Sequence, residues 1–444
     1  RITSKIKKNS HIKRNEGFNL TKSQKVWKRA LKVIPGGNML LSKRPEMFLP
    51  DKWPSYFSKS KGCEVWDLDG NRFIDMSVMG IGTNILGYGN EEVDAAVIQT
   101  VRDGNMSSLN CPEEVYLAEK LVQMHPWADM VKFARTGGEA NAIAVRIART
   151  ASGKDQVAIC GYHGWHDWYL AVNLNSDSND GLGEHLLPGL SPNGVPQNLS
   201  DTVFPFRYND FDGLQALVND NNIGVIKMEV TRNTEPEDEF LQKVRQLATD
   251  NGIVLVFDEC TSGFRETFGG IHAKYGVEPD IAVFGKAMGN GYAITAILGR
   301  KEVMESAQDS FISSTFWTER IGFTAALATL EKYEKNRVHL HLVESGEKIN
   351  KYWTQLAESI GLDISISGLA PLTHIDFKYS NASCLQTIYT QEMLKRGMLT
   401  LGTHNLSFSH KKTEIDHLLA SYEAVLPIIK DNIDNLELHG EEDA

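Results

Sequence analysis

A short apolar run near the middle of this 444-residue chain constrains its fold more than any other feature. Residues Ile253–Phe257 (IVLVF) are apolar at every position, so the run does not alternate between a polar and an apolar face. A strand that is apolar on both faces is typical of the centre of a parallel sheet that helices cover on both sides. The run ends in Asp258, and a second short apolar run, Asp280–Phe284, ends in Gly285-Lys286.

The sequence around these runs predicts alternating strands and helices. We expect strands at 130–133, 156–160, 224–229, 253–257, 281–284 and 296–298, and helices at 113–124, 139–150 and 241–250. This alternation predicts an α/β fold with an open, mostly parallel sheet, in which ligands bind at the carboxyl ends of strands. Beyond residue 320, amphipathic helices at 321–334, 339–359 and 413–429 and two short strands predict a smaller α+β C-terminal domain.

Composition and charge exclude several classes of protein. The net charge of −11 argues against a general nucleic-acid binder, and the basic segment with Lys5, Lys7, Lys8, Lys13 and Arg14 is interpreted as a solvated, flexible arm. No apolar run approaches the roughly 20 residues of a membrane span, and no signal-peptide pattern is present. The five cysteines are scattered without a C-x-x-C pair, which predicts a cytoplasmic protein with neither a disulfide framework nor a zinc site.

Asp258 and Lys286 are the candidate catalytic residues. A lysine at a strand end can form a Schiff base with an aldehyde cofactor, and an aspartate can keep the pyridine nitrogen of that cofactor protonated. The pair therefore predicts pyridoxal 5′-phosphate (PLP) chemistry. Taken singly, Lys286 could be a solvent-facing loop lysine and Asp258 a helix N-cap, and the prediction depends on finding both.

Two further segments could hold such a cofactor. Gly137 and Gly138 lie between a predicted strand and a small-residue helix, where backbone N–H groups and the helix dipole favour a phosphate group. Tyr162 follows the strand at 156–160 and could stack on a planar ring, with His163 supporting it. His163 and His166 have the spacing of metal ligands, but further ligands are missing, so no metal is predicted. No G-x-G-x-x-G follows an opening strand, which argues against a nicotinamide cofactor.

Together these residues resemble the class III (fold type I) PLP-dependent aminotransferases, and within them the glutamate-1-semialdehyde 2,1-aminomutase branch. The resemblance runs from about Val26 to Ile429. Its most specific segments are KGCEVWDLDGNRFIDM at 61–76, TGGEANAIAVRIAR at 136–149, GYHGW at 161–165, DECTSGFR at 258–265 and FGKAMGNGY at 284–292.

The resemblance implies a role for several residues. Lys286 would carry the cofactor and shuttle protons, and Asp258 would contact the pyridine nitrogen. Cys260 would lie under the ring face opposite Tyr162, and Gly137 with Gly138 would bind the phosphate. Thr315 would reach the phosphate of a neighbouring subunit, because members of the family are homodimers with sites at the interface. Glu229 matches an acid on the preceding strand, and Asn233 a nearby polar contact to the cofactor.

The resemblance also implies a division of the chain into four parts. Residues 1–20 would form the flexible arm, and 21–110 a segment that contributes to the small domain and the dimer interface. Residues 111–320 would form the large PLP-binding domain, and 321–444 the small C-terminal domain.

The chain departs from the aminomutase branch in regions that face the substrate. Cys260 stands where the family has a small β-branched residue, and Ile81 where the branch has a tryptophan. The segment Ser314–Arg320 replaces a G-T-x-x-G-N-P motif, and Thr403-His404-Asn405 replaces an acid. Trp317, Glu319 and His404 point to a polar, hydroxylated substrate, such as a keto- or aldehydo-sugar.

We therefore predict a homodimeric PLP-dependent aminotransferase that moves an amino group from an amino-acid donor, L-glutamate, to a small carbonyl acceptor that could be sugar-like. An intramolecular 2,1-aminomutase using the same residues is the nearest alternative. Epimerase or decarboxylase chemistry on the same cofactor is also open. A non-catalytic partner protein with a PLP fold is the alternative of a different class, and the intact Lys286 and Asp258 argue against it.

Overall fold

The computed structural model describes residues 20–174, 190–231 and 233–433. The predicted basic arm lies outside the described residues, except for residue 20. Within these residues the chain divides into two compact units, one with residues 20–59 and 65–72 and the other with residues 60–64 and the described residues from 73 to 433. The division into parts at residues 20, 110 and 320 remains a prediction.

The first unit contains helix α2 (Lys22–Val33), which matches the capping signals in its sequence. Thr21 caps the helix, and the side chains of Thr21 and Gln24 satisfy each other's backbone N–H groups in a capping box. Trp27 packs on the buried side of the helix, and its indole Nε1 donates a hydrogen bond to Glu46 at 3.0 Å. The turn that follows β2 (Glu64–Asp67) is organised by Asp67, whose Oδ1 accepts hydrogen bonds from the N–H groups of Asp69 and Asn71.

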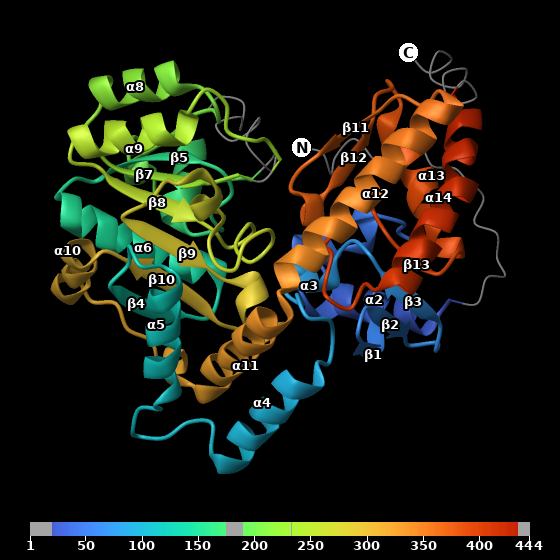
Figure 1. Ribbon diagram of the computed structural model, residues 1–444, viewed down its shortest axis with the longest axis horizontal. Helices are drawn as coiled ribbons and strands as arrows, with labels where there is room; N and C mark the ends of the chain where they lie inside the picture. Colours follow the sequence, from blue (N-terminus) through green and yellow to red (C-terminus); the bar gives the residue numbers. More distant parts are fainter. Residues whose placement is uncertain (1–19, 175–189, 232, 434–444) are drawn as a thin grey trace. The chain divides into compact units, whose positions relative to one another are not determined.

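The second unit is built around a seven-stranded sheet with the order β4-β10-β9-β8-β7-β5-β6 (Figure 1). Strands β5 to β9 run parallel to one another, whereas β10 is antiparallel to both β4 and β9. The predicted central strand is β8, and it is buried along its whole length. The bounds are β4 Met130–Ala134, β5 Gln156–Cys160, β6 Val203–Pro205, β7 Ile223–Glu229, β8 Val254–Asp258, β9 Ile281–Phe284 and β10 Thr295–Gly299.

Helices cover both faces of this sheet, as the apolar pattern of β8 requires. Helix α6 (Gly137–Ser152) packs on one face, where Ala140 and Ala144 join Val225 and Val256 in one apolar cluster. Helices α8 (Phe211–Asp220) and α9 (Phe240–Asp250) cover the other face (Figure 1). The small side chains of α6 let it lie close to the strands.

The parallel strands bring distant polar residues to one edge of the sheet. Glu229, at the end of β7, pairs in register with Asp258, at the end of β8. Asp258 in turn lies opposite Val283 of β9, and Lys286 follows three residues later. The predicted meeting of Asp258 and Lys286 at the carboxyl edge is therefore a consequence of parallel pairing.

The remaining strands and α-helices lie before, within and after this sheet along the chain. Strands β1 and β3 span Phe57–Lys61 and Arg72–Asp75, and helices α3, α4, α5, α7 and α10 span Met79–Gly82, Glu91–Asp103, Glu113–Met124, Asp167–Leu170 and Lys301–Met304. The C-terminal region contains α11 Arg320–Asn336, α12 Val338–Ile360, β11 Ile364–Ser367, β12 His374–Phe377, α13 Ala382–Lys395, β13 Met398–Leu399 and α14 Lys412–Asp431. Helices α4, α8 and α13 were not expected from the apolar pattern. Within the described residues, no helix combines the length and the apolar character that crossing a bilayer requires.

Candidate cofactor site

Asp258 lies at the centre of a buried hydrogen-bond network. Its Oδ2 accepts a hydrogen bond from the amide of Asn141 on α6 at 2.8 Å and one from Nδ1 of His163 at 2.8 Å. Its Oδ1 accepts a third from the backbone N–H of Cys260 at 3.0 Å. A carboxylate offers about four acceptor positions, so these three nitrogen donors leave one, next to which lies the weakly donating thiol of Cys260.

The network keeps Asp258 ionised although the residue is only 3% exposed. Burial by itself raises the pKa of a carboxyl group, but the charge of Lys227 and the hydrogen bond from His163 outweigh it. The net effect lowers the pKa of Asp258 well below its usual range. Burial also lowers the pKa of His163, so the imidazole is neutral at neutral pH and donates through Nδ1–H.

Lys286 is held in an unusual backbone conformation just beyond β9. Its φ of 35° lies in the left-handed region, which a non-glycine residue rarely adopts outside a functional or strained position. Its Nζ donates a hydrogen bond to Thr261 Oγ1 at 2.8 Å. A Cβ atom on the preceding Gly285 would come within 3.1 Å of the Thr295 side chain, so a larger residue here would require Thr295 to shift.

Gly137 and Gly138 form the first turn of α6, next to the loop that carries Cys260. Thr136 and Glu139 close a capping box that occupies the N–H groups of Thr136 and Glu139. The N–H groups of the two glycines have no acceptor within the helix, because the first turn of a helix has none to offer. These N–H groups, with the positive end of the helix dipole, suit a phosphate group.

The aromatic and acidic residues predicted for the site lie around the same edge of the sheet. Tyr162 follows β5 and is partly exposed, and its ring meets that of Tyr169 edge-on at 6.0 Å. His163 contacts Asp258 directly, which is a different role from the predicted support of Tyr162. Burial, together with the Asp258 carboxylate, raises the pKa of Cys260 well above the ordinary value of a thiol, so this side chain stays neutral. Glu229 is buried against Gly161, whose φ of 120° requires glycine.

Two of the predicted site residues, Thr315 and Asn233, are not part of the hydrogen-bond network described around Asp258. Thr315 is exposed at the start of a short 3₁₀ helix, Thr315–Thr318, and a role toward a neighbouring subunit stays a prediction. Asn233 is exposed and lines a separate pocket of about 340 Å³ with Thr231 and residues of β11. A contact between Asn233 and a cofactor also stays a prediction.

The residues fit PLP. The free acceptor position of Asp258 suits a protonated pyridine nitrogen, the glycine N–H groups suit a phosphate, and Lys286 supplies the amine. The buried Nε2 of His163 and Oδ1 of Asn141 have no hydrogen-bond partner among the described residues. Both atoms can therefore accept a further hydrogen bond near Asp258. In the described part of the chain, no group of three or more histidine, cysteine or acidic residues is placed to hold a metal ion.

Three residues of the network were not predicted from the sequence. Asn141 is a polar residue on the sheet-facing side of an otherwise small and apolar helix, and this position could have indicated it. Thr261 lies within the DECTSGFR segment but resembles any loop threonine. Lys227 interrupts the apolar run of β7, and a lysine inside such a run is unusual enough to have been noticed.

Two of the three residues that pointed to a sugar-like substrate have structural roles. Glu319 caps α11 by accepting hydrogen bonds from the N–H groups of Ile321 and Gly322, and it also forms an ion pair with Arg135 at 3.0 Å. His404 is 2% exposed and stacks on Trp353, with ring centroids 4.4 Å apart. These two residues therefore give no support to a hydroxylated substrate. The sequence could not reveal this, because glutamate and histidine occur both in binding sites and in structural roles.

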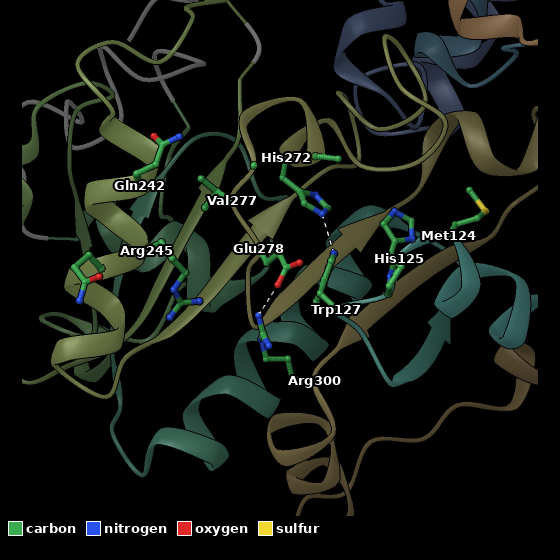
Figure 2. Close-up of a pocket in the computed structure, with 13 residues that line it drawn as sticks. Met124, His125, Trp127, Gln242, Arg245, His272, Val277, Glu278 and Arg300 are labelled. Carbon is green, nitrogen blue, oxygen red and sulfur yellow. Dashed lines mark hydrogen bonds and ion pairs between the residues drawn. The ribbon is translucent and has the colours of Figure 1, made fainter.

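A pocket of about 560 Å³ on the second unit lies apart from Asp258 and Lys286 (Figure 2). Its charged residues are paired: Arg300 with Glu278 at 3.1 Å, and Arg245 with Asp280 at 3.0 Å. His272 accepts a hydrogen bond from Trp127 at 2.9 Å (Figure 2) and donates to Glu259 at 2.8 Å. The pocket therefore borders the His272–Glu259 pair and is separate from the cofactor site.

The fold and the site define a fold type I PLP-dependent transferase. A family model for class-III aminotransferases matches residues 50–413, and the chain belongs to this family. It is 32% identical over 90% of its length to a 3-aminobutyryl-CoA aminotransferase of Cloacimonas acidaminovorans, covering 95% of that protein. It is 31% identical over 94% of its length to a glutamate-1-semialdehyde 2,1-aminomutase of Methanothrix thermoacetophila, covering 99% of it.

Two other similarities bear on the substrate and the fold. A 2′-deamino-2′-hydroxyneamine transaminase of Streptomyces kanamyceticus is 29% identical over 84% of the chain and 91% of that protein. The FumI protein of Sphingopyxis sp. MTA144, solved in the PLP internal aldimine form, superimposes with a TM-score of 0.83 at 25% identity, covering 92% of this chain and 97% of that one. The predicted class, fold and cofactor are confirmed: the protein is a PLP-dependent aminotransferase.

Proposed function

We propose that Asp258 and Lys286 are the catalytic residues and that the enzyme transfers an amino group from L-glutamate to a small carbonyl acceptor. The observation that carries the assignment is the free acceptor position of Asp258, a buried carboxylate at the same sheet edge as Lys286. PLP, when bound, supplies an electron sink for the substrate's α-carbon. Gly137 and Gly138 would bind its phosphate through their N–H groups, and Tyr162 and Cys260 would lie against the two faces of its ring.

The chain's own residues then divide the work. Asp258 would hold the proton on the ring nitrogen, with Asn141 and His163 fixing the direction of its carboxylate. Lys286 Nζ would move the proton from the α-carbon of the donor to C4′ of the cofactor, and would run the same transfer in reverse, from C4′ to the carbon of the acceptor, in the second half of the reaction. Thr261 Oγ1, which now accepts from Lys286, would steady the amine between the two steps. Glu229 and Asn233 are proposed as further contacts to the cofactor.

We also propose that the protein is a homodimer and that Thr315 completes the partner's phosphate site. The exposure of Thr315 and of the neighbouring Phe311 and Phe316 supports a surface that another subunit could cover. Measuring the molar mass by light scattering, for the wild type and for Thr315→Ala, tests the dimer. A monomer that binds PLP normally would contradict the proposal.

The acceptor is proposed from similarity rather than from the site. The likeness to a 2′-deamino-2′-hydroxyneamine transaminase favours a sugar-like carbonyl compound, whereas the likeness to a 3-aminobutyryl-CoA aminotransferase favours a 3-oxo compound. A panel of both classes, offered with L-glutamate, would separate them by the rate at which 2-oxoglutarate is released.

An absorption spectrum before and after L-glutamate is added, without acceptor, tests the reaction itself. We expect the visible band of bound PLP to bleach and 2-oxoglutarate to appear in amounts equal to the enzyme sites. Lys286→Ala is the matched control and should release none. A 2,1-aminomutase is the second candidate, favoured by the likeness to the Methanothrix enzyme, and it would convert its substrate without releasing a keto acid.

A further inference from the structure

Lys227 is a buried lysine that the proposed reaction does not use. It lies in the middle of β7, is 0% exposed, and is flanked by Ile159 of β5 and Val256 of β8. Its Nζ has no hydrogen-bond partner among the described residues. Lysine is almost never fully buried without a partner, because removing an ammonium group from water is costly. An aliphatic side chain would fill the same space without that cost. The presence of a lysine at this position therefore points to a role for its amino group.

The register of the sheet places Lys227 beside Asp258. Residues two apart on a strand point to the same face, so Lys227 shares its face with Val225 and Glu229. Glu229 lies directly opposite Asp258 on β8, which puts Asp258 one step further along the same face. This face is the one that α6 covers, and α6 also contributes Asn141 to the network around Asp258.

The groups near Lys227 are mostly acidic. Burial lowers the pKa of Lys227, and the charges of Asp258 and Glu229 act against that effect and favour the ammonium form. His163 lies in the loop after β5 and faces these groups. Burial lowers the pKa of its imidazole, and the charge of Lys227 lowers this pKa further. From α6 the polar group that reaches Asp258 is the neutral amide of Asn141. One ammonium therefore acts on both the carboxylate and the imidazole that binds it.

We propose that Lys227 is a positioning residue whose buried ammonium keeps Asp258 ionised and His163 neutral, so that Asp258 presents a free acceptor to the ring nitrogen of PLP at acidic as well as neutral pH. The inference depends on the proposed contact between Asp258 and PLP. It does not make Lys227 a catalytic residue, because its Nζ acts through Asp258.

Lys227→Met tests the proposal, since methionine keeps the length of the side chain and removes its charge. Without the ammonium, the effect of burial on Asp258 is opposed less, and the carboxyl group protonates at higher pH. A protonated Asp258 loses its anionic acceptor, so PLP should bind more weakly as the pH falls. The readout is the dissociation constant of PLP from the apoprotein between pH 5.5 and 8.5, followed by tryptophan fluorescence.

We expect PLP affinity of Lys227→Met to fall at least about tenfold more between pH 8.5 and 5.5 than that of the wild type, since a shift of one pKa unit corresponds to a tenfold change. Lys132→Met is the matched control: it removes a partly buried lysine of β4 in the same sheet and should follow the wild-type profile. In an Asp258→Asn background, Lys227→Met should add less pH dependence than in the wild-type background, because the Asp258 carboxyl group no longer titrates.

Each other outcome contradicts a particular step. If PLP affinity of Lys227→Met follows the wild type at every pH while Asp258→Asn weakens binding, Lys227 does not act on Asp258. If neither variant changes PLP affinity, the proposed role of Asp258 itself is wrong. Loss of the folded apoprotein in Lys227→Met, seen by circular dichroism, would give Lys227 a purely structural role and would also overturn the proposal.

Discussion

Replacing Asp258 by asparagine removes the charge at the centre of the proposed site while keeping the shape of the side chain. The carboxylate accepts three hydrogen bonds, from Asn141, His163 and the backbone of Cys260. An asparagine offers a single acceptor atom and two N–H donors. Its amide group must therefore point a donor either at Asn141 and His163 or at the Cys260 N–H, and the ring nitrogen of PLP would also lose its anionic partner.

The structure sets the expected size of two effects. A hydrogen bond to a charged group contributes about 1.5–3 kcal/mol, so the dissociation constant of PLP should rise roughly 10- to 150-fold. The apoprotein should also lose about 3 kcal/mol of unfolding free energy, because Lys227 is left buried without its principal counter-charge. Transamination should slow further, since the ring nitrogen is no longer held protonated.

Equilibrium binding of PLP and urea unfolding of the apoprotein measure these two quantities separately. Asp280→Asn is the matched control, because Asp280 accepts from Arg245 at 3.0 Å and from the Leu255 N–H at 2.8 Å just before β9 begins. It should lose about 1–2 kcal/mol of stability and leave PLP affinity unchanged. An Asp258→Asn enzyme with wild-type PLP affinity and turnover would refute the role of Asp258 at the ring nitrogen.

Three further outcomes are expected. Lys286→Ala should keep its fold, measured by circular dichroism, and lose all turnover, and normal transamination by this variant would exclude Lys286 as the catalytic amine. Glu319→Ala should lower the unfolding free energy by about 1–2 kcal/mol through loss of a helix cap and leave the KM for the acceptor unchanged; a large rise in KM would restore Glu319 as a substrate contact. Burial lowers the pKa of His404 to about 3 and of His410 to about 4, so both stay neutral in the fold and take up protons only on unfolding as the pH falls below about 6.5. These two histidines should therefore lower the unfolding free energy by about 2.7 kcal/mol per pH unit between roughly pH 6 and 4.5, and His404→Gln should reduce the measured slope by about 1.4 kcal/mol per pH unit in urea titrations; an unchanged slope would contradict the burial argument.

Much of the large sheet could be predicted because its strands carry a local signal. The run Ile253–Phe257 is apolar on both faces. A strand of this kind is typically found in the middle of a parallel sheet that helices cover on both sides. Helix α6 was expected from the residues that follow Gly137-Gly138, although the helix begins at the glycines themselves. Helices α4, α8 and α13 were missed, since their apolar residues do not stand out from the surrounding sequence.

The PLP chemistry could be predicted from short stretches of the sequence. Asp258 and Lys286 each follow an apolar strand, and parallel strands end at the same edge, so placing both residues at one edge required no knowledge of distant contacts. The residues that surround them follow from tertiary packing. The electrostatic effect of Lys227 on Asp258 depends on the register between β7 and β8, and the structural roles of Glu319 and His404 depend on partners far away in the chain or on a helix end. The partners of a side chain are set by long-range packing, which the local pattern of residues does not specify.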